Sequence, residues 1–161
     1  MAIPLEIIDL SKTYDTKEAV RNISFKVKEN EIIGILGPNG CGKTTTIGMI
    51  LGLLKPTGGK VLINGLEIEK ERVDLLNELN FISPYIELPK KLTVKQNLEV
   101  YGRLYDVKEL GIKIDYLCEK LRLNEFINKI TGELSSGQKN RVSLAKSIIN
   151  DPSVLLLDEP T

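Results

Sequence analysis

The stretch that decides the fold runs from Glu31 to Thr44 and reads EIIGILGPNGCGKT. Its first six residues are almost continuously apolar, which predicts a buried parallel strand covered on both faces. Its last eight match the motif G-x-x-x-x-G-K-[ST]. Apolar residues then recur at positions 47, 50, 51 and 54, a spacing that predicts a helix ending before Lys55. A strand, a glycine-rich loop and a helix in this order are the context that the motif requires.

The chemistry of this loop points to phosphate. Glycines let the backbone curl so that successive N–H groups face phosphate oxygens, and the start of the helix adds partial positive charge. Lys43 is expected to reach the β and γ oxygens, and Thr44 to hold Mg²⁺. The predicted phosphate-binding residues are Gly37, Pro38, Asn39, Gly40, Cys41, Gly42, Lys43, Thr44 and Thr45. The alternative is a glycine-rich turn that merely joins a strand to a helix.

A pair of carboxylates ends a second apolar run near the C-terminus. Residues 154–157 are Val-Leu-Leu-Leu and are followed by Asp158 and Glu159. Ligands of open α/β sheets bind beyond the carboxyl ends of the strands, where this pair would lie. Asp158 is expected to orient Mg²⁺, and Glu159 to polarise the attacking water as the catalytic base beside Lys43. A solvated acidic pair that merely ends a strand is the alternative.

Composition limits the other possibilities. The 161 residues suit one domain, and the 22 Lys and Arg balance the 22 Asp and Glu, so no overall charge draws the chain to nucleic acid or to anionic lipid. There is no His, which removes the commonest general base and metal ligand. Cys41 and Cys118 form no CxxC pair and are expected to be reduced thiols. We therefore expect no nucleic-acid partner. No apolar run approaches the roughly 20 residues that a spanning helix requires, and the N-terminus is acidic where a signal peptide would be basic, so we also expect a cytoplasmic location.

The remaining elements follow from periodicity and turn residues. Strict alternation predicts a strand over 22–28, near a sheet edge or in an antiparallel layer, and Asn64-Gly65 predicts a hairpin turn between strands 61–63 and 66–68. Thr93 and Gln96 predict a capping box that opens a helix. Helices are predicted over 69–78, 93–105, 113–121 and 138–149, and a last strand over 154–158.

A third motif lies directly before the helix predicted over 138–149. It reads LSSGQ and comprises Leu134, Ser135, Ser136, Gly137 and Gln138. With the phosphate loop upstream and LLLDEPT downstream, the chain resembles the ATP-binding subunits of ABC transporters, whose signature is LSGGQ. Ser135 and the N–H groups after it would form a second anion site at a helix start. An ordinary Ser-capped helix start is the alternative.

The resemblance implies a fold and a division of the chain. The fold is α/β, of the P-loop NTPase type, with a mainly parallel sheet flanked by helices, an N-terminal antiparallel β layer and a helical signature subdomain. It implies a single partial domain over 1–161. Within it we expect a nucleotide-binding core with its β layer at 1–83, a helical subdomain at 84–137, and the signature helix with the Walker B strand at 138–161.

The resemblance also implies function and partners. ATP and Mg²⁺ would bind, Tyr14 would stack on adenine, and two subunits would pack head to tail so that the signature of one caps the ATP of the other. A lone Tyr is otherwise a residue of the partly buried core. Hydrolysis would drive transport, in the direction of export, through a membrane permease that holds the subunit at the inner face. A catalytically impaired nucleotide-binding module and a non-transport ABC protein are the alternatives.

Two departures from the family pattern affect catalysis. Pro84 stands where the Q-loop usually carries Gln, and Pro has no side-chain donor or acceptor, so Ser83 or Glu87 is the candidate substitute. The sequence also closes at Thr161, before the D-loop and the switch histidine of the family. We therefore expect a fold that is incomplete at the C-terminus, a fragment of a longer protein.

Overall fold

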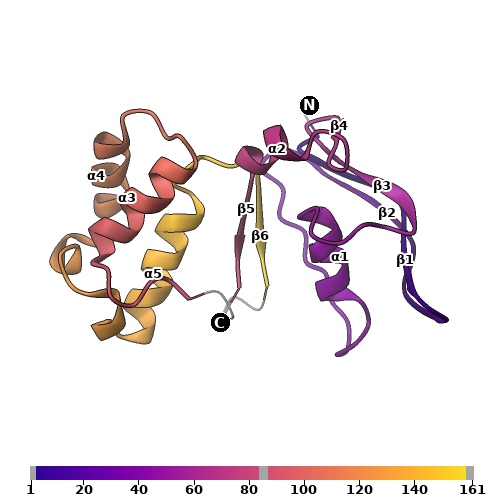
Figure 1. The fold of residues 1–161 in the computed structure, drawn as a ribbon, viewed down its shortest axis with the longest axis horizontal. Coiled ribbons are helices and arrows are strands. Elements are labelled where there is room, and N and C mark those ends of the chain that lie inside the picture. The colour runs from indigo at the N-terminus through magenta and orange to yellow at the C-terminus, as the bar shows by residue number, and fades with distance from the viewer. Residues whose placement is uncertain (1–2, 84–86, 159–161) are drawn as a thin grey trace. The chain divides into compact units, whose positions relative to one another are not determined.

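The computed structural model describes residues 3–83 and 87–158. The chain forms two compact units, residues 1–79 and 80–161, which we call the first and the second unit. The first contains an antiparallel sheet and the helix that follows the glycine-rich loop, and the second contains three longer helices and a pair of strands (Figure 1).

The first unit is built on a four-stranded sheet of order β2-β1-β3-β4. The strands are β1 (Leu5–Tyr14), β2 (Lys17–Val27), β3 (Gly58–Ile63) and β4 (Leu66–Glu67), and each neighbouring pair is antiparallel. The predicted strand over 22–28 is therefore confirmed as part of β2, at the edge of an antiparallel layer. The predicted hairpin turn is also confirmed, because Asn64 and Gly65 adopt φ angles of 49° and 82° between β3 and β4.

Helix α1 (Lys43–Ile50) lies against this sheet in Figure 1 and buries its second half. Met49 and Ile50 are among its buried side chains, and the sheet contributes buried apolar residues from β1 and β3 to the same core. The helix predicted here is confirmed, but it ends at Ile50 rather than at Leu54. Gly52, with φ 64°, turns the chain, and the N–H groups of Leu53 and Leu54 donate to the carbonyl of Gly48.

The predicted strand over 31–36 is wrong. These residues have no regular secondary structure, all are exposed, and the side chains of Ile32 and Leu36 are 97% and 93% exposed. A parallel strand receives its hydrogen bonds and its apolar cover from elements that are distant in sequence. No strand of the described chain pairs with this segment. An apolar run by itself therefore does not form a parallel strand. The larger sheet of the described residues is the four-stranded antiparallel one.

The second unit holds helices α3 (Val94–Leu104), α4 (Leu110–Lys120) and α5 (Ser136–Ser147), close to the ranges predicted. Short 3₁₀ turns occur at Asn124–Phe126 and Thr131–Glu133. The helices share one apolar core, made of Val94, Leu98, Ile114, Leu117, Cys118, Leu123, Phe126, Leu134, Val142, Ala145 and Ile149. This core fixes the place at which α5 begins.

Three smaller elements complete the chain. The helix predicted over 69–78 is shorter, with α2 (Arg72–Leu75) followed by a 3₁₀ turn at Leu76–Glu78. Strands β5 (Leu79–Ile82) and β6 (Val154–Leu157) pair with each other and run in the same direction in Figure 1. The last strand was predicted over 154–158 and is confirmed.

Candidate functional site

The glycine-rich loop owes its shape to two residues with positive φ. Gly40 has φ 82°, and Gly42, the N-cap of α1, has φ 95°. A Cβ atom on Gly42 would lie 2.3 Å from the carbonyl oxygen of Ala19 and 3.0 Å from Val20. Glycine is therefore required at position 42 for its backbone conformation and for its close approach to β2.

The start of α1 presents free backbone donors. Within residues 3–83, the N–H groups of Gly42, Lys43 and Thr44 have no acceptor, and the first bonded one is that of Thr46, which donates to Gly42 at 2.8 Å. Unpaired N–H groups and the helix dipole together favour an anion at this position. The loop therefore has the donor set of a phosphate site.

The side chain of Lys43 points back at its own loop. Its Nζ donates to the carbonyl oxygens of Gly37 at 2.7 Å and Pro38 at 3.0 Å. The neighbouring threonines differ in exposure, since Thr44 is exposed, Thr45 is half-buried, and the buried Thr46 donates its hydroxyl hydrogen to the Gly42 carbonyl at 2.9 Å. Thr44 is thus the threonine of this turn whose side chain is accessible to a bound cation.

Cys41 stands at the fifth position of the glycine-rich loop. Its thiol is free and exposed, and its backbone N–H donates to the Pro38 carbonyl at 3.3 Å. Its Sγ is so close to Gly37 that a Cβ placed on Gly37 would approach it to 2.5 Å. A side chain at position 37 would therefore have to displace the Cys41 thiol.

Tyr14 ends strand β1 on the same unit as the loop. Its side chain is 42% exposed, and the Nζ of Lys12 lies 5.1 Å from the centre of its ring. Tyr14 pairs with Lys17 of β2, two residues before Ala19, whose carbonyl lies against Gly42. One short stretch of β2 therefore connects the aromatic residue with the start of α1.

The LSSGQ residues form the start of α5. Ser135 is the N-cap, and its Oγ accepts the N–H of Gln138 at 3.3 Å while the Gln138 side chain accepts the N–H of Ser135 at 3.0 Å. Leu134 is buried in the core of the second unit, whereas Ser135, Ser136 and Gly137 are exposed. The sequence motif is thus an anchored leucine followed by an exposed, capped helix start.

Asp158 follows β6 and is half-buried, with its backbone N–H donating to the Ile82 carbonyl at 2.9 Å. The predicted base Glu159 and the Q-loop Pro84 lie outside the described residues. Of the two substitutes considered for the Q-loop, Ser83 is buried, and Glu87 is exposed and forms an ion pair with Lys90 at 2.7 Å. The phosphate loop and Tyr14 thus belong to the first unit, and the LSSGQ residues and Asp158 to the second.

A partly buried polar group that no sequence pattern predicted holds α5, the helix that begins at the LSSGQ motif. Lys146 of α5 donates to Asn80 Oδ1 at 3.0 Å and lies 5.0 Å from the ring centre of Tyr101 on α3. Asn80 in turn donates to Asn150 at 2.8 Å. Burial lowers the pKa of Lys146, because it disfavours the charged ammonium. These residues are distant in sequence and belong to no recognisable motif, so their contacts could not be predicted before the fold was known.

The structure also bears on metal binding and on membrane insertion. Among the residues that the structure describes, no three or more Cys, Asp or Glu side chains gather as a metal site. Mg²⁺ does not require such a cluster, because it is commonly held by one or two protein ligands, phosphate oxygens and waters. In the same part of the chain no helix is both long and apolar enough to cross a bilayer.

Comparison with known proteins gives consistent matches. The model of the family described as ABC transporter matches residues 20–161. The Nod factor export ATP-binding protein I of Rhizobium etli is 36% identical over 98% of this chain and 50% of its own length. The ABC transporter ATP-binding protein NatA of Bacillus subtilis is 32% identical over 98% of this chain and 67% of its own length.

Solved structures match as well. The structure of cbiO1 from Clostridium perfringens, described as part of the ABC transporter complex cbiONQ, has a TM-score of 0.87 and 30% identity, and covers 100% of this chain and 67% of its own. A structure of the ATP-binding subunit of an ABC transporter has a TM-score of 0.87 and 27% identity over 97% of this chain. The chain spans about half the length of the first curated relatives that it matches.

Proposed function

Because the chain belongs to the ABC transporter family, we propose that it binds ATP through residues 37–45 and serves as the nucleotide-binding part of a transporter subunit. The observation that carries this proposal is the geometry around Lys43. Its ammonium donates to the loop carbonyls of Gly37 and Pro38, and the N–H groups that start α1 are unpaired. These are the donors that a triphosphate needs.

Binding exchanges one set of hydrogen bonds for another. Lys43 would leave the two carbonyls for β and γ oxygens, and the N–H groups of Gly42, Lys43 and Thr44 would take the phosphate oxygens that they face. Thr44 and Asp158 would hold Mg²⁺, which neutralises the charge that develops on the phosphates. Tyr14 would stack on the adenine ring.

Hydrolysis adds one more group. Glu159 follows Asp158 in sequence and would accept a proton from the water that attacks the γ-phosphate. Its backbone neighbour Asp158 is fixed to β5 through the Ile82 carbonyl. Lys43 would stabilise the charge on the transferring group.

The second unit supplies a surface for a partner. Ser135, Ser136 and Gly137 are exposed at a helix start, where the backbone N–H groups and the helix dipole favour an anion. We propose that these three residues contact the γ-phosphate of an ATP molecule bound by a second subunit in a head-to-tail dimer. The subunit would attach to a membrane permease at the cytoplasmic face of the membrane. The names of the relatives from Rhizobium and Bacillus favour a role in transport, and the name of the Rhizobium relative favours export.

Nucleotide binding is tested with Lys43→Met and a fluorescent ATP analogue. The variant keeps the length of the side chain and removes the charge, so affinity should fall at least about tenfold, because charge-assisted bonds to phosphate are the strong ones. Lys108→Met is the matched control, because Lys108 is an exposed lysine of the second unit. Equal affinity of the wild type and Lys43→Met would contradict the proposal.

One sequence feature favours a second function, nucleotide binding without turnover. Pro84 occupies the Q-loop position of Gln and cannot contact the metal or the water through its side chain. A phosphate-release assay with Mg-ATP separates the two functions, since clear turnover that Glu159→Gln abolishes supports hydrolysis. Tight ATP binding with no release of phosphate supports the binding module.

A further inference from the structure

The ring of Tyr14 stands at an exposed strand end. Strand β1 has irregular register with β2 between Ile7 and Thr13, and it shifts again with β3 between Ile8 and Ser11. The regular ladder is therefore interrupted over the residues that lead to Tyr14. Polar side chains provide additional contacts there, and they join β1 to the segment that follows α1.

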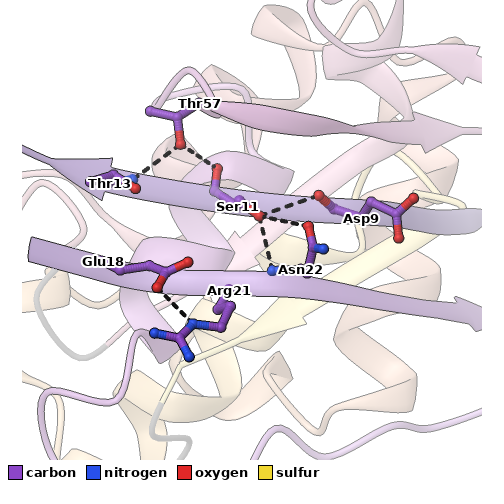
Figure 2. Close-up of polar contacts among 7 residues, drawn as sticks. All are labelled: Asp9, Ser11, Thr13, Glu18, Arg21, Asn22 and Thr57. Atoms are coloured by element: carbon purple, nitrogen blue, oxygen red, sulfur yellow. Dashed lines mark hydrogen bonds and ion pairs between the residues drawn. The ribbon is translucent and has the colours of Figure 1, made fainter.

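Thr57 makes the central contact. Its Oγ1 accepts the backbone N–H of Thr13 at 3.1 Å and donates to the Ser11 carbonyl at 3.1 Å (Figure 2). Its own N–H donates to the same carbonyl at 2.9 Å. Ser11 is also fixed from the other side, because its Oγ bonds to the backbone N–H of Asn22 at 2.9 Å and to the Asn22 side chain at 3.1 Å. Thr57 thus adds a side-chain hydrogen bond to Thr13, the residue next to Tyr14.

Lys12 makes a second contact to the same segment. Its Nζ donates to the Lys55 carbonyl at 2.7 Å and lies 5.1 Å from the centre of the Tyr14 ring. An ammonium at this distance from an aromatic ring is attracted to it. The ammonium of Lys12 is therefore held at the Lys55 carbonyl, and its charge attracts the ring of Tyr14.

Residues 55–57 in turn follow the helix that carries the phosphate loop. After α1 ends at Ile50, Leu53 and Leu54 return their N–H groups to Gly48 within that helix. Lys55 and Thr57 come next in the chain. The contacts thus form a short physical connection from α1, which begins at Lys43, to the aromatic residue at the end of β1.

We propose that Thr57 is a positioning residue that holds Tyr14 in place for a nucleotide bound at the phosphate loop, and that Lys12 supports it. The inference rests on the proposed nucleotide site. Thr57 does not touch the nucleotide, and its effect on binding passes through Thr13 and the ring of Tyr14. Its contribution should therefore depend on the presence of the base in the ligand.

The test compares two ligands and two variants. Thr57→Val keeps the shape of the side chain and removes the hydroxyl, whereas Thr57→Ser keeps the hydroxyl. Dissociation constants are measured for ATP and for inorganic tripolyphosphate, which has no base. For Thr57→Val, ATP binding should weaken about three- to tenfold and tripolyphosphate binding should change less than about twofold, and Thr57→Ser should restore ATP binding.

A second pair of measurements removes the aromatic ring. In a Tyr14→Ala background, Thr57→Val should cause no further loss of ATP affinity, because the group that it positions is gone. Lys12→Met provides an independent variant with Thr57 intact, and it should also weaken ATP binding more than tripolyphosphate binding. Thermal unfolding of each variant shows whether the fold persists.

The outcomes are distinct. Equal weakening of ATP and tripolyphosphate by Thr57→Val, or additive losses with Tyr14→Ala, would assign Thr57 a structural role and overturn the inference. Unchanged ATP binding in both Thr57→Val and Lys12→Met would overturn it as well. A wild type that binds neither ligand would overturn the proposed function itself, which is a different result from a wild type that binds both.

Discussion

Lys43 donates a 2.7 Å hydrogen bond to the carbonyl oxygen of Gly37, six residues earlier in the same loop. The bond closes the loop on itself and keeps the ammonium on the loop that would receive phosphate. A ligand that displaces it must offer the ammonium at least as many acceptors. The oxygens of a triphosphate do so with negative charge in addition.

Gly42→Ala should destabilise the first unit and abolish ATP binding. The left-handed conformation alone costs a non-glycine residue about 1–2 kcal/mol, and the new Cβ would lie 2.3 Å from the Ala19 carbonyl oxygen. Urea denaturation measures the first effect, and titration with a fluorescent ATP analogue measures the second. Gly111→Ala in α4 is the control, because its would-be Cβ meets no atom within 4 Å beyond its chain neighbours and the backbone of its own helix, and it should stabilise by about 0.5–1 kcal/mol. A fully stable, ATP-binding Gly42→Ala would show that the loop is not constrained as described.

The two cysteines should differ sharply in thiol labelling. Cys41 is exposed and Cys118 is buried, and burial raises the pKa of the Cys118 thiol, which keeps it protonated. We expect one fast-reacting thiol per folded chain, lost in Cys41→Ser and retained in Cys118→Ser. Because Cys41 belongs to the phosphate loop, ATP should slow its labelling in proportion to occupancy. Labelling of Cys41 that is equally fast with saturating ATP would argue against a nucleotide on this loop.

Ser135→Ala should affect both stability and association. Loss of the capping box at α5 should lower the free energy of unfolding by about 1 kcal/mol. Thr93→Ala removes the same kind of capping box from α3 and should cost a similar amount. Only Ser135→Ala should weaken the ATP-dependent dimer, which light scattering detects. If both variants weakened the dimer equally, the loss would reflect helix stability alone.

Lys146→Met should reveal the pH dependence of a buried ammonium. Burial lowers the pKa of Lys146 below 10.5 in the folded chain, so the folded state binds its proton less tightly than the unfolded state. The cost of burying the charge is fully present below the folded pKa and is relieved as the pH rises through it towards 10.5. The wild type should therefore gain stability relative to Lys146→Met as the pH is raised from neutrality.

Urea denaturation of both proteins at several pH values measures this difference. Lys108→Met removes an exposed lysine and controls for the loss of one positive charge. A constant difference for Lys146→Met would mean that its ammonium is effectively hydrated in solution.

Local signals predicted local structure well. Thr93 and Gln96 form the expected capping box, and Asn64 and Gly65 form the expected hairpin turn, because each depends on contacts within a few residues. The start of α5 at the LSSGQ motif follows from the same kind of signal. The roles of Lys43, Thr44 and Asp158 stay predictions, with the geometry of Lys43 in their support.

Contacts between distant residues were not predictable in the same way. The strand expected over 31–36 depends on partners far along the chain, and the described residues provide none. The bonds of Thr57 to Ser11 and Thr13 arise where the register of β1 is irregular, and no sequence pattern marks that irregularity. The amide and ammonium group of Asn80 and Lys146 likewise joins residues 66 positions apart.

The open segment 31–36 has a consequence for handling the protein. Short apolar stretches with high β propensity and little charge are the segments through which chains aggregate. Ile32, Ile33, Ile35 and Leu36 form such a stretch, and all four side chains are exposed. Colloidal stability of the isolated chain should therefore be limited by these few residues, rather than by its balanced overall charge.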